Sequence, residues 1–142
     1  LAALTGAKAV TAAGAVFAGL QQLGVRKLAL ATPYPASISA LGKTYWEAAG
    51  FTIVAHHRLD DVINIYEETE DRAAQLARAA NVPAAEAVLI SGTGLPTVGV
   101  LDALERELGK PVITSNQASM WRALRLAGLR EPIAGFGRLL RS

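Results

Sequence analysis

One stretch of the sequence combines residue types and spacing that favour chemistry: the segment Ser-Gly-Thr-Gly at positions 91–94. An apolar run precedes it and a helical pattern follows it. A buried strand that ends in such a loop ahead of a helix leaves backbone N–H groups pointing in one direction, which favours an anion. The N–H groups of Thr93 and Gly94, with the hydroxyls of Ser91 and Thr93, would then bind an oxyanion or a carboxylate. The alternative is a plain turn in which the glycines only permit positive φ.

The loop matches neither of the common phosphate-binding motifs. The third glycine of a dinucleotide-binding fingerprint is missing after Gly92 and Gly94, and the Gly-Lys-Ser/Thr of a P-loop is absent. The remaining polar residues near predicted strand ends are uncharged hydrogen-bonding groups. The sequence therefore favours a small carboxylate bound by neutral donors.

The other candidate polar residues lie next to other predicted strands and helices. Thr32 ends an apolar run, and Tyr34 lies between two prolines, where its hydroxyl could donate to a carboxylate or the ring could simply pack. Asn64 follows an acidic pair and is either a further donor or a turn residue. Ser115 and Asn116 start a helix, where they either cap it or, outside the residues that contact a ligand directly, add a second helix N-terminus aimed at an anion.

Hydrophobic periodicity predicts an alternation of strands and helices. Strands are expected at residues 7–10, 27–31, 51–57, 86–90 and 111–113. Helices are expected at residues 12–23, 37–49, 66–80, 98–108 and 117–127. This alternation indicates an α/β fold, a parallel sheet of about four to five strands with helices on both faces. Ligands of such sheets bind at the carboxyl ends of the strands, which places the candidate residues and residues 10–11 on one rim.

The domain organisation is an α/β lobe at residues 1–128 and a carboxyl-terminal tail at residues 129–142. The tail breaks the alternation and is expected to be irregular. Its apolar residues are Ile133, Phe136, Leu139 and Leu140. We expect them to pack on a missing lobe or on a partner. The sequence opens without an initiator Met, a charged leader or a signal peptide, so we expect a piece of a longer protein.

Composition excludes several classes of function. The net charge is +2 with scattered basic residues, which argues against nucleic acid, and no apolar run reaches the roughly 18 residues of a membrane span. With no cysteine and only the adjacent His56 and His57, we expect no disulfide, no metal and no cofactor. The two histidines alternate across a strand and are interpreted as structural, and the acidic residues at 67–71 as a solvated helix start. We expect a cytoplasmic protein.

Several segments together resemble one branch of the aspartate/glutamate racemase superfamily, the branch that holds maleate cis–trans isomerase and arylmalonate decarboxylase. The segments that carry the resemblance are residues 23–34 (LGVRKLALATPY), 90–97 (ISGTGLPT), 104–112, 115–118, 121–128 and 135–140. The resemblance implies two similar lobes with the site in the cleft between them. This chain would be the second lobe with its tail, and its partners would be the first lobe of the same protein and a small dicarboxylate. We also expect a homo-oligomer.

The resemblance also implies roles for individual residues. Tyr34 matches a carboxylate-binding tyrosine, Asn64 a substrate-binding asparagine, and Thr93 and Gly94 a backbone cradle. Gly92 lies where these enzymes place a catalytic cysteine, and a glycine is not reactive.

The leading hypothesis is a cofactor-independent isomerase that converts maleate to fumarate. In the mechanism that the resemblance implies, a cysteine thiolate adds to the double bond, the adduct rotates, and a second cysteine handles the proton. The alternatives are an arylmalonate decarboxylase-like lyase or racemase, or a non-catalytic carboxylate-binding relative. A receiver-like signalling domain is disfavoured because the strands expected to end at residues 10 and 31 carry no acidic cluster.

Overall fold

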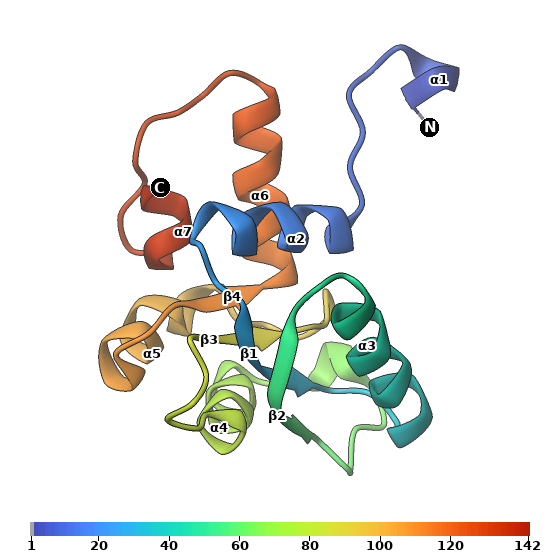
Figure 1. The fold of residues 1–142 in the computed structure, drawn as a ribbon, viewed down its shortest axis with the longest axis vertical. Helices are drawn as coiled ribbons and strands as arrows, with labels where there is room; N and C mark the ends of the chain where they lie inside the picture. The colour runs from blue at the N-terminus through green and yellow to red at the C-terminus, as the bar shows by residue number, and fades with distance from the viewer. Residues whose placement is uncertain (1) are drawn as a thin grey trace.

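Parallel strands form the centre of the fold (Figure 1), and the computed structural model describes residues 2–142. The strands are β1 (Lys27–Thr32), β2 (Thr52–Arg58), β3 (Ala87–Ile90) and β4 (Val112–Thr114). They pair in parallel in the order β2-β1-β3-β4. The chain leaves β1 toward one edge of the sheet and leaves β3 toward the other. The carboxyl ends of these neighbouring strands are therefore the switch point at which open α/β sheets bind ligands.

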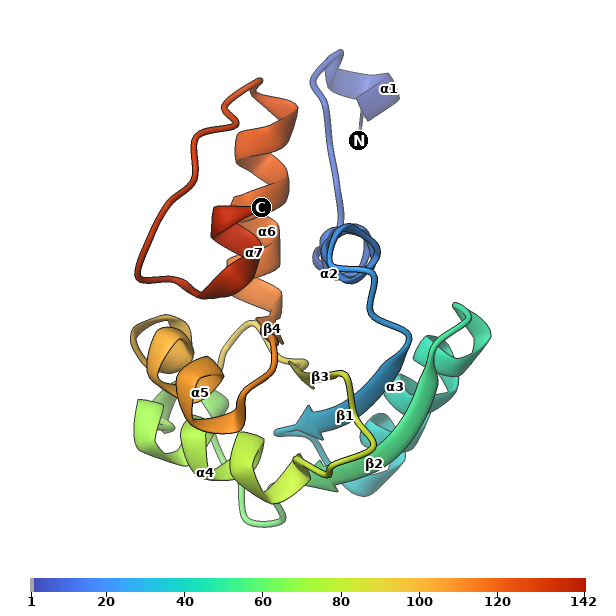
Figure 2. The ribbon, with the colours of Figure 1, turned by 60° about the vertical axis from the view of Figure 1, so that its left-hand side comes forward.

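Helices cover both faces of this sheet, as Figure 2 shows. One face carries α2 (Ala12–Gln22), α3 (Ala36–Ala48), α6 (Ser115–Leu126) and α7 (Gly137–Arg141). The other carries α4 (Glu70–Ala80) and α5 (Leu101–Leu108). Strand residues alternate between the two layers, with Leu28 and Leu30 in the first core and Ala29 and Ala31 in the second. The expected α/β sheet with helices on both faces is confirmed, with four strands.

The strand expected at residues 7–10 is wrong. These residues form no strand, and they link α1 (Ala2–Thr5) to α2 with exposed side chains. The segment offers Val10 as its one large apolar side chain, so pairing with the sheet would bury little area. Residues 10–11 therefore do not belong to the rim. Thr11 does cap α2, because its Oγ1 accepts from the N–H of Gly14 at 3.0 Å.

Two expected helices are interrupted. The helix expected at 66–80 is divided into a 3₁₀ turn, η1 (Ile65–Glu67), and α4, whose N-cap Thr69 accepts from the N–H of Arg72. The helix expected at 98–108 begins as a 3₁₀ turn, η2 (Val98–Val100), before α5. The other elements begin and end within two residues of their expected bounds.

The tail contains a helix, α7, that the sequence pattern did not predict. The N–H groups of Gly137 and Arg138 donate to the carboxylates of Asp102 and Glu105 on α5, so tertiary contacts hold its start. Leu139 is buried in this same lobe.

Other apolar side chains of the tail stay open to solvent. Leu129 and Phe136 are 51% and 40% exposed. For these residues, packing on another lobe or partner stays a prediction.

The amino-terminal arm and the far end of α6 extend away from the sheet on the same side (Figures 1 and 2). The ammonium group of Lys8 donates to the carbonyl of Leu126 at 3.1 Å and links the two segments. Across residues 2–142, every helix is too short or too polar to cross a membrane.

Candidate carboxylate-binding site

The loop that follows β3 is held from behind by the start of α6. The N–H of Gly92 donates to Ser115 Oγ at 3.3 Å, and the amide of Asn116 donates to the carbonyl of Thr93 at 3.0 Å. Thr114 and Gln117 form a capping box that fixes the first turn of the helix. Ser115 and Asn116 thus support the loop through its backbone, and a role of this helix start in binding an anion stays a prediction.

The backbone N–H groups of Thr93 and Gly94 make no hydrogen bond to any residue that the structure describes. The N–H of Gly92, in contrast, is satisfied by Ser115. Thr93 is exposed, while Ser91 and Gly94 are partly buried. The loop therefore presents two unpaired donors at the carboxyl end of β3, as an anion site requires.

Tyr34 lies directly over this loop. A Cβ atom built on Gly92 would be 3.4 Å from the Tyr34 hydroxyl and 2.8 Å from Cγ of Pro33. Burial raises the pKa of the Tyr34 hydroxyl above its ordinary value, and the nearby Tyr66 adds to the shift. Tyr34 therefore remains a neutral donor beside the free N–H groups, and the structure brings the strand ends of β1 and β3 together as predicted.

The glycines of the loop are needed because neighbouring side chains approach their backbone closely, and not because the backbone has an unusual conformation. Neither Gly92 nor Gly94 is among the glycines of residues 2–142 that have positive φ. A Cβ atom on Gly94 would approach Cγ2 of Ile65 to 2.7 Å, as one on Gly92 would approach Pro33. The expectation that these glycines permit positive φ is therefore wrong, because the space around each glycine is what excludes a side chain.

Thr32 does not lie in the cradle. Its side chain is 1% exposed, and its hydroxyl contacts the hydroxyl of Ser39 at 2.7 Å and Nε2 of His56 at 3.3 Å. A direct contact between Thr32 and a ligand is therefore wrong, since the residue lies beneath the rim. Sequence reasoning missed Ser39, although its position one helical turn after Pro35 was a signal for a contact with the preceding loop.

Asn64 is exposed, and its side chain is already engaged. Its Oδ1 accepts from the N–H of Tyr66 at 3.1 Å, and its Nδ2 donates to the carboxylate of Glu67 at 2.9 Å. The neighbouring Ile65 contacts the loop, because it limits the space at Gly94. Asn64 thus caps η1 near the site, and its binding of a substrate stays a prediction.

The helical start that follows the loop is occupied by an anion of the chain itself. A carboxylate oxygen of Glu70 accepts from the N–H of Gly99 at 2.9 Å. The sequence suggested that the acidic residues at 67–71 are all solvated. For Glu70 this interpretation is wrong, because its carboxylate binds the N–H of Gly99. The donors open to an external anion lie in the loop itself.

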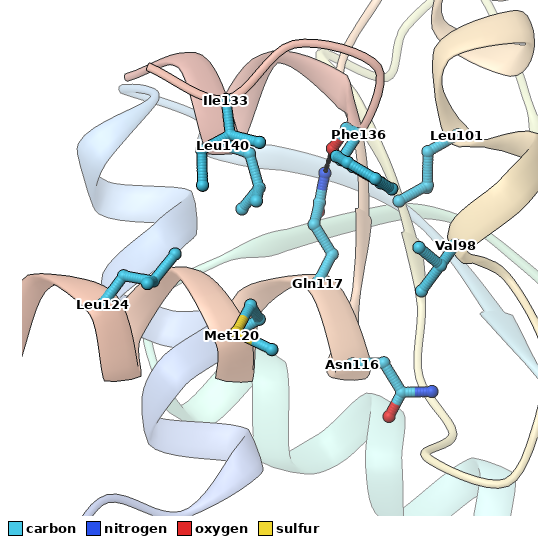
Figure 3. A pocket seen from close by; sticks show the side chains of 9 residues that line it. All are labelled: Val98, Leu101, Asn116, Gln117, Met120, Leu124, Ile133, Phe136 and Leu140. Carbon is cyan, nitrogen blue, oxygen red and sulfur yellow. Dashed lines mark hydrogen bonds between the residues drawn. The ribbon is translucent and has the colours of Figure 1, made fainter. Parts of the chain in front are cut away.

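An apolar pocket of about 440 Å³ lies on the other side of Asn116 (Figure 3). It is lined by Val98, Leu101, Asn116, Gln117, Met120, Leu124, Ile133, Phe136 and Leu140. The amide of Gln117 donates to the carbonyl of Phe136 at 2.7 Å, the bond drawn in the figure, and that of Asn116 is bound to Thr93. The pocket was not predicted, and it presents no charged group to a carboxylate.

Known proteins match nearly the whole of this chain. The sequence profile of the arylmalonate decarboxylase family matches residues 1–140. The chain is 31% identical to the maleate isomerase of Nocardia farcinica, over 92% of this chain and 53% of that protein. It is 34% identical to the arylmalonate decarboxylase of Bordetella bronchiseptica, over 95% of this chain and 58% of that protein. It therefore spans a little over half the length of these curated relatives.

Solved structures show the same fold. A crystal structure of arylmalonate decarboxylase superposes with a TM-score of 0.84 at 30% identity, over 98% of this chain and 62% of that one. A Nocardia farcinica maleate cis–trans isomerase variant with a covalently bound succinylcysteine intermediate superposes with a TM-score of 0.89 at 30% identity, over 98% and 59%. By its profile, its relatives and its fold, the chain belongs to the arylmalonate decarboxylase family.

Proposed function

We propose that this chain is the carboxylate-binding lobe of a cofactor-independent isomerase of small dicarboxylates, and that the whole protein converts maleate to fumarate. The observation that carries the proposal is that the Tyr34 hydroxyl, 3.4 Å from where a Cβ atom on Gly92 would lie, borders the loop whose Thr93 and Gly94 N–H groups make no hydrogen bond to a described residue. All three donors are uncharged.

A carboxylate group suits this arrangement. Each of its oxygens accepts hydrogen bonds, and bonds to a charged acceptor contribute about 1.5–3 kcal/mol. The raised pKa of Tyr34 keeps its proton available for donation. In the proposed arrangement, the second carboxylate of the ligand would face the other lobe across the cleft.

The chemical step needs a group that these residues do not supply. The chain contains no cysteine, and Gly92 stands where the resemblance places one. The solved maleate isomerase variant carries its intermediate on a cysteine. In the proposed reaction a thiolate from outside this lobe adds to one carbon of the double bond, and the remaining carbon–carbon single bond rotates. Loss of the thiolate then re-forms the double bond as fumarate. The cradle would hold one carboxylate while the rest of the adduct turns.

A non-catalytic carboxylate-binding relative is the second candidate. The Pro33 ring occupies the space that a Cβ atom at position 92 would need, which favours a site adapted to the loss of the cysteine. An arylmalonate decarboxylase-like lyase or a racemase stays as the alternative chemistry of the same family, and it needs the same missing thiol.

The test is to incubate the intact protein with maleate and to follow fumarate by proton NMR, with and without a thiol-alkylating reagent. Fumarate formation that alkylation abolishes supports the isomerase. Saturable binding of maleate without turnover supports the binding relative instead. If the protein neither turns over nor binds maleate, the proposal fails.

A matched pair of variants tests the place of the loop. Gly92→Cys combined with Pro33→Ala gives the new side chain room, whereas Gly92→Cys alone forces it against the proline ring. We expect the double variant to show more turnover than the single variant. If both variants fold and bind maleate but neither shows turnover, the assignment of position 92 to the catalytic cysteine is contradicted.

A further inference from the structure

The hydroxyl of Thr32 lies within a buried row of polar groups under Tyr34. Thr32 Oγ1 is 2.7 Å from Ser39 Oγ and 3.3 Å from His56 Nε2, and Ser39 Oγ is 2.9 Å from the carbonyl oxygen of Tyr34. The row therefore connects β2, the end of β1, the start of α3 and the backbone of the tyrosine.

Counting hydrogens fixes the direction of every bond in this row. The carbonyl of Tyr34 can only accept, so the single hydroxyl proton of Ser39 is directed to it. Ser39 Oγ must then accept from Thr32, whose only hydroxyl proton is used in that bond. Thr32 can therefore only accept from His56, which requires a proton on Nε2.

We propose that His56 is a positioning residue that holds Tyr34 for ligand binding through this ordered chain of hydrogen bonds by way of Thr32 and Ser39. The inference rests on the proposed carboxylate-binding role of Tyr34. Hydrogen bonds that run in one direction polarise and strengthen one another. Proline follows both Thr32 and Tyr34 and restricts each to extended conformations, so little backbone freedom remains once the Tyr34 carbonyl is held.

The hydrogen bond from His56 to Thr32 does not depend on whether the imidazole is neutral or charged. Burial, with the positive charges of Lys43 and Arg58 and the neighbouring His57, lowers its pKa. Lys43 pairs with Glu47, and Arg58 pairs with Asp60. When His56 does take up a proton, the proton goes to Nδ1, and Nε2 still donates to Thr32. The positioning effect is therefore expected not to change across the titration of the imidazole.

The variants that test this role are His56→Leu, which removes the donor, and His56→Gln, whose amide nitrogen can replace Nε2. His57→Leu is the matched control, because His57 is the exposed neighbour on the same strand. In the intact protein we expect His56→Leu to weaken maleate binding about 5- to 10-fold, as the loss of about one net hydrogen bond would. His56→Gln is expected to keep most of the affinity, and His57→Leu all of it.

A double variant, His56→Leu with Thr32→Val, distinguishes positioning of Tyr34 through the hydrogen-bonded row from a general loss of structure. If both residues act through the same chain, the loss in the His56→Leu, Thr32→Val double variant equals that of one single variant. Wild-type affinity in His56→Leu, or fully additive losses in the double variant, would overturn the proposal.

A measurement without ligand keeps the inference separate from the proposed function. Nitrogen-15 NMR of the wild-type imidazole is expected to show the Nε2–H tautomer, and the Tyr34 ring signals are expected to shift in His56→Leu but not in His57→Leu. An Nδ1–H tautomer or unchanged Tyr34 signals would refute the role of His56. Absence of maleate binding in the wild type, with these NMR results as expected, would refute only the proposed function.

Discussion

Two segments contact the glycines of the loop at 91–94, and they differ in how they are held. Pro33 and Tyr34 face Gly92, and their peptide is tied to the interior through Ser39. Ile65 and Tyr66 face Gly94, and the bonds of their segment stay within η1. The first wall of the site is therefore tied to the sheet by hydrogen bonds, whereas the second is held to the core only by the packing of Ile65.

Exposure follows the same division. Ile63 and Tyr66 are 100% and 81% exposed, whereas Thr32, under the first wall, is 1% exposed. Segments with few buried contacts open at low free-energy cost. The β1 side of the site is therefore preformed, and we expect the segment around Asn64 to adjust more readily when a ligand binds.

The largest effect is expected from Tyr34→Phe. Loss of a hydrogen bond to a charged carboxylate costs about 1.5–3 kcal/mol, which corresponds to about 10- to 100-fold in the dissociation constant of maleate. Calorimetric titration measures it, and Tyr66→Phe is the control from the exposed wall. Equal losses in the two variants would contradict the division into an anchored and an adjustable wall.

A smaller effect is expected on stability from Gly92→Ala. The new Cβ meets the Pro33 ring at 2.8 Å, and overpacking of this kind costs about 1–3 kcal/mol in the free energy of unfolding. Gly94→Ala is the counterpart, in which Ile65 can move away, so we expect a cost below about 1 kcal/mol from the same mechanism. Urea denaturation compares them.

Adding Pro33→Ala separates this contact from other causes. The substitution should restore much of the stability that Gly92→Ala loses and do nothing for Gly94→Ala. A larger cost at Gly94 than at Gly92 would reverse the assignment of the two walls.

Asn64→Ala tests the exposed segment with a smaller expected change. Loss of the cap of η1 should lower the free energy of unfolding by about 0.5–1 kcal/mol. Any contact with maleate must first break the bond to Glu67, so the loss of affinity should be smaller than for Tyr34→Phe. Calorimetric titration with maleate measures this loss of affinity. A loss as large as that of Tyr34→Phe would show that Asn64 binds maleate directly.

The smallest change concerns pH. The pKa of Tyr34 is raised, so the hydroxyl keeps its proton at pH values where an ordinary tyrosine, with a pKa of about 10, begins to ionise. Maleate affinity should therefore stay level from neutral pH to about pH 10. The unfolded chain ionises first, so the contribution of Tyr34 to stability is complete below that value and falls as the pH rises further. An affinity that declines already between pH 8 and about pH 9 would contradict a buried donor.

Sequence reasoning worked where local signals and burial agree. The strands at β1, β2, β3 and β4 were predicted from continuous apolar runs, and the convergence of Tyr34 with the loop follows from strand ends on one rim. It failed at residues 7–10, where a short apolar run lacks enough area to pair, and at α7, whose start depends on Asp102 and Glu105 from another helix.

The sequence by itself determined the α/β alternation, the family, the small-residue loop at 91–94 and the absence of a thiol. Periodicity encodes the alternation and composition the missing thiol, while the resemblance of several segments carried the family. Only the tertiary structure decided that Thr32 lies beneath the cradle, that Glu70 occupies the helical start at Gly99, and that Pro33 fills the space beside Gly92. It also brought His56 under Tyr34. Each of these depends on contacts between residues far apart in the chain, whose distances and hydrogen-bond directions exist only once the sheet has formed.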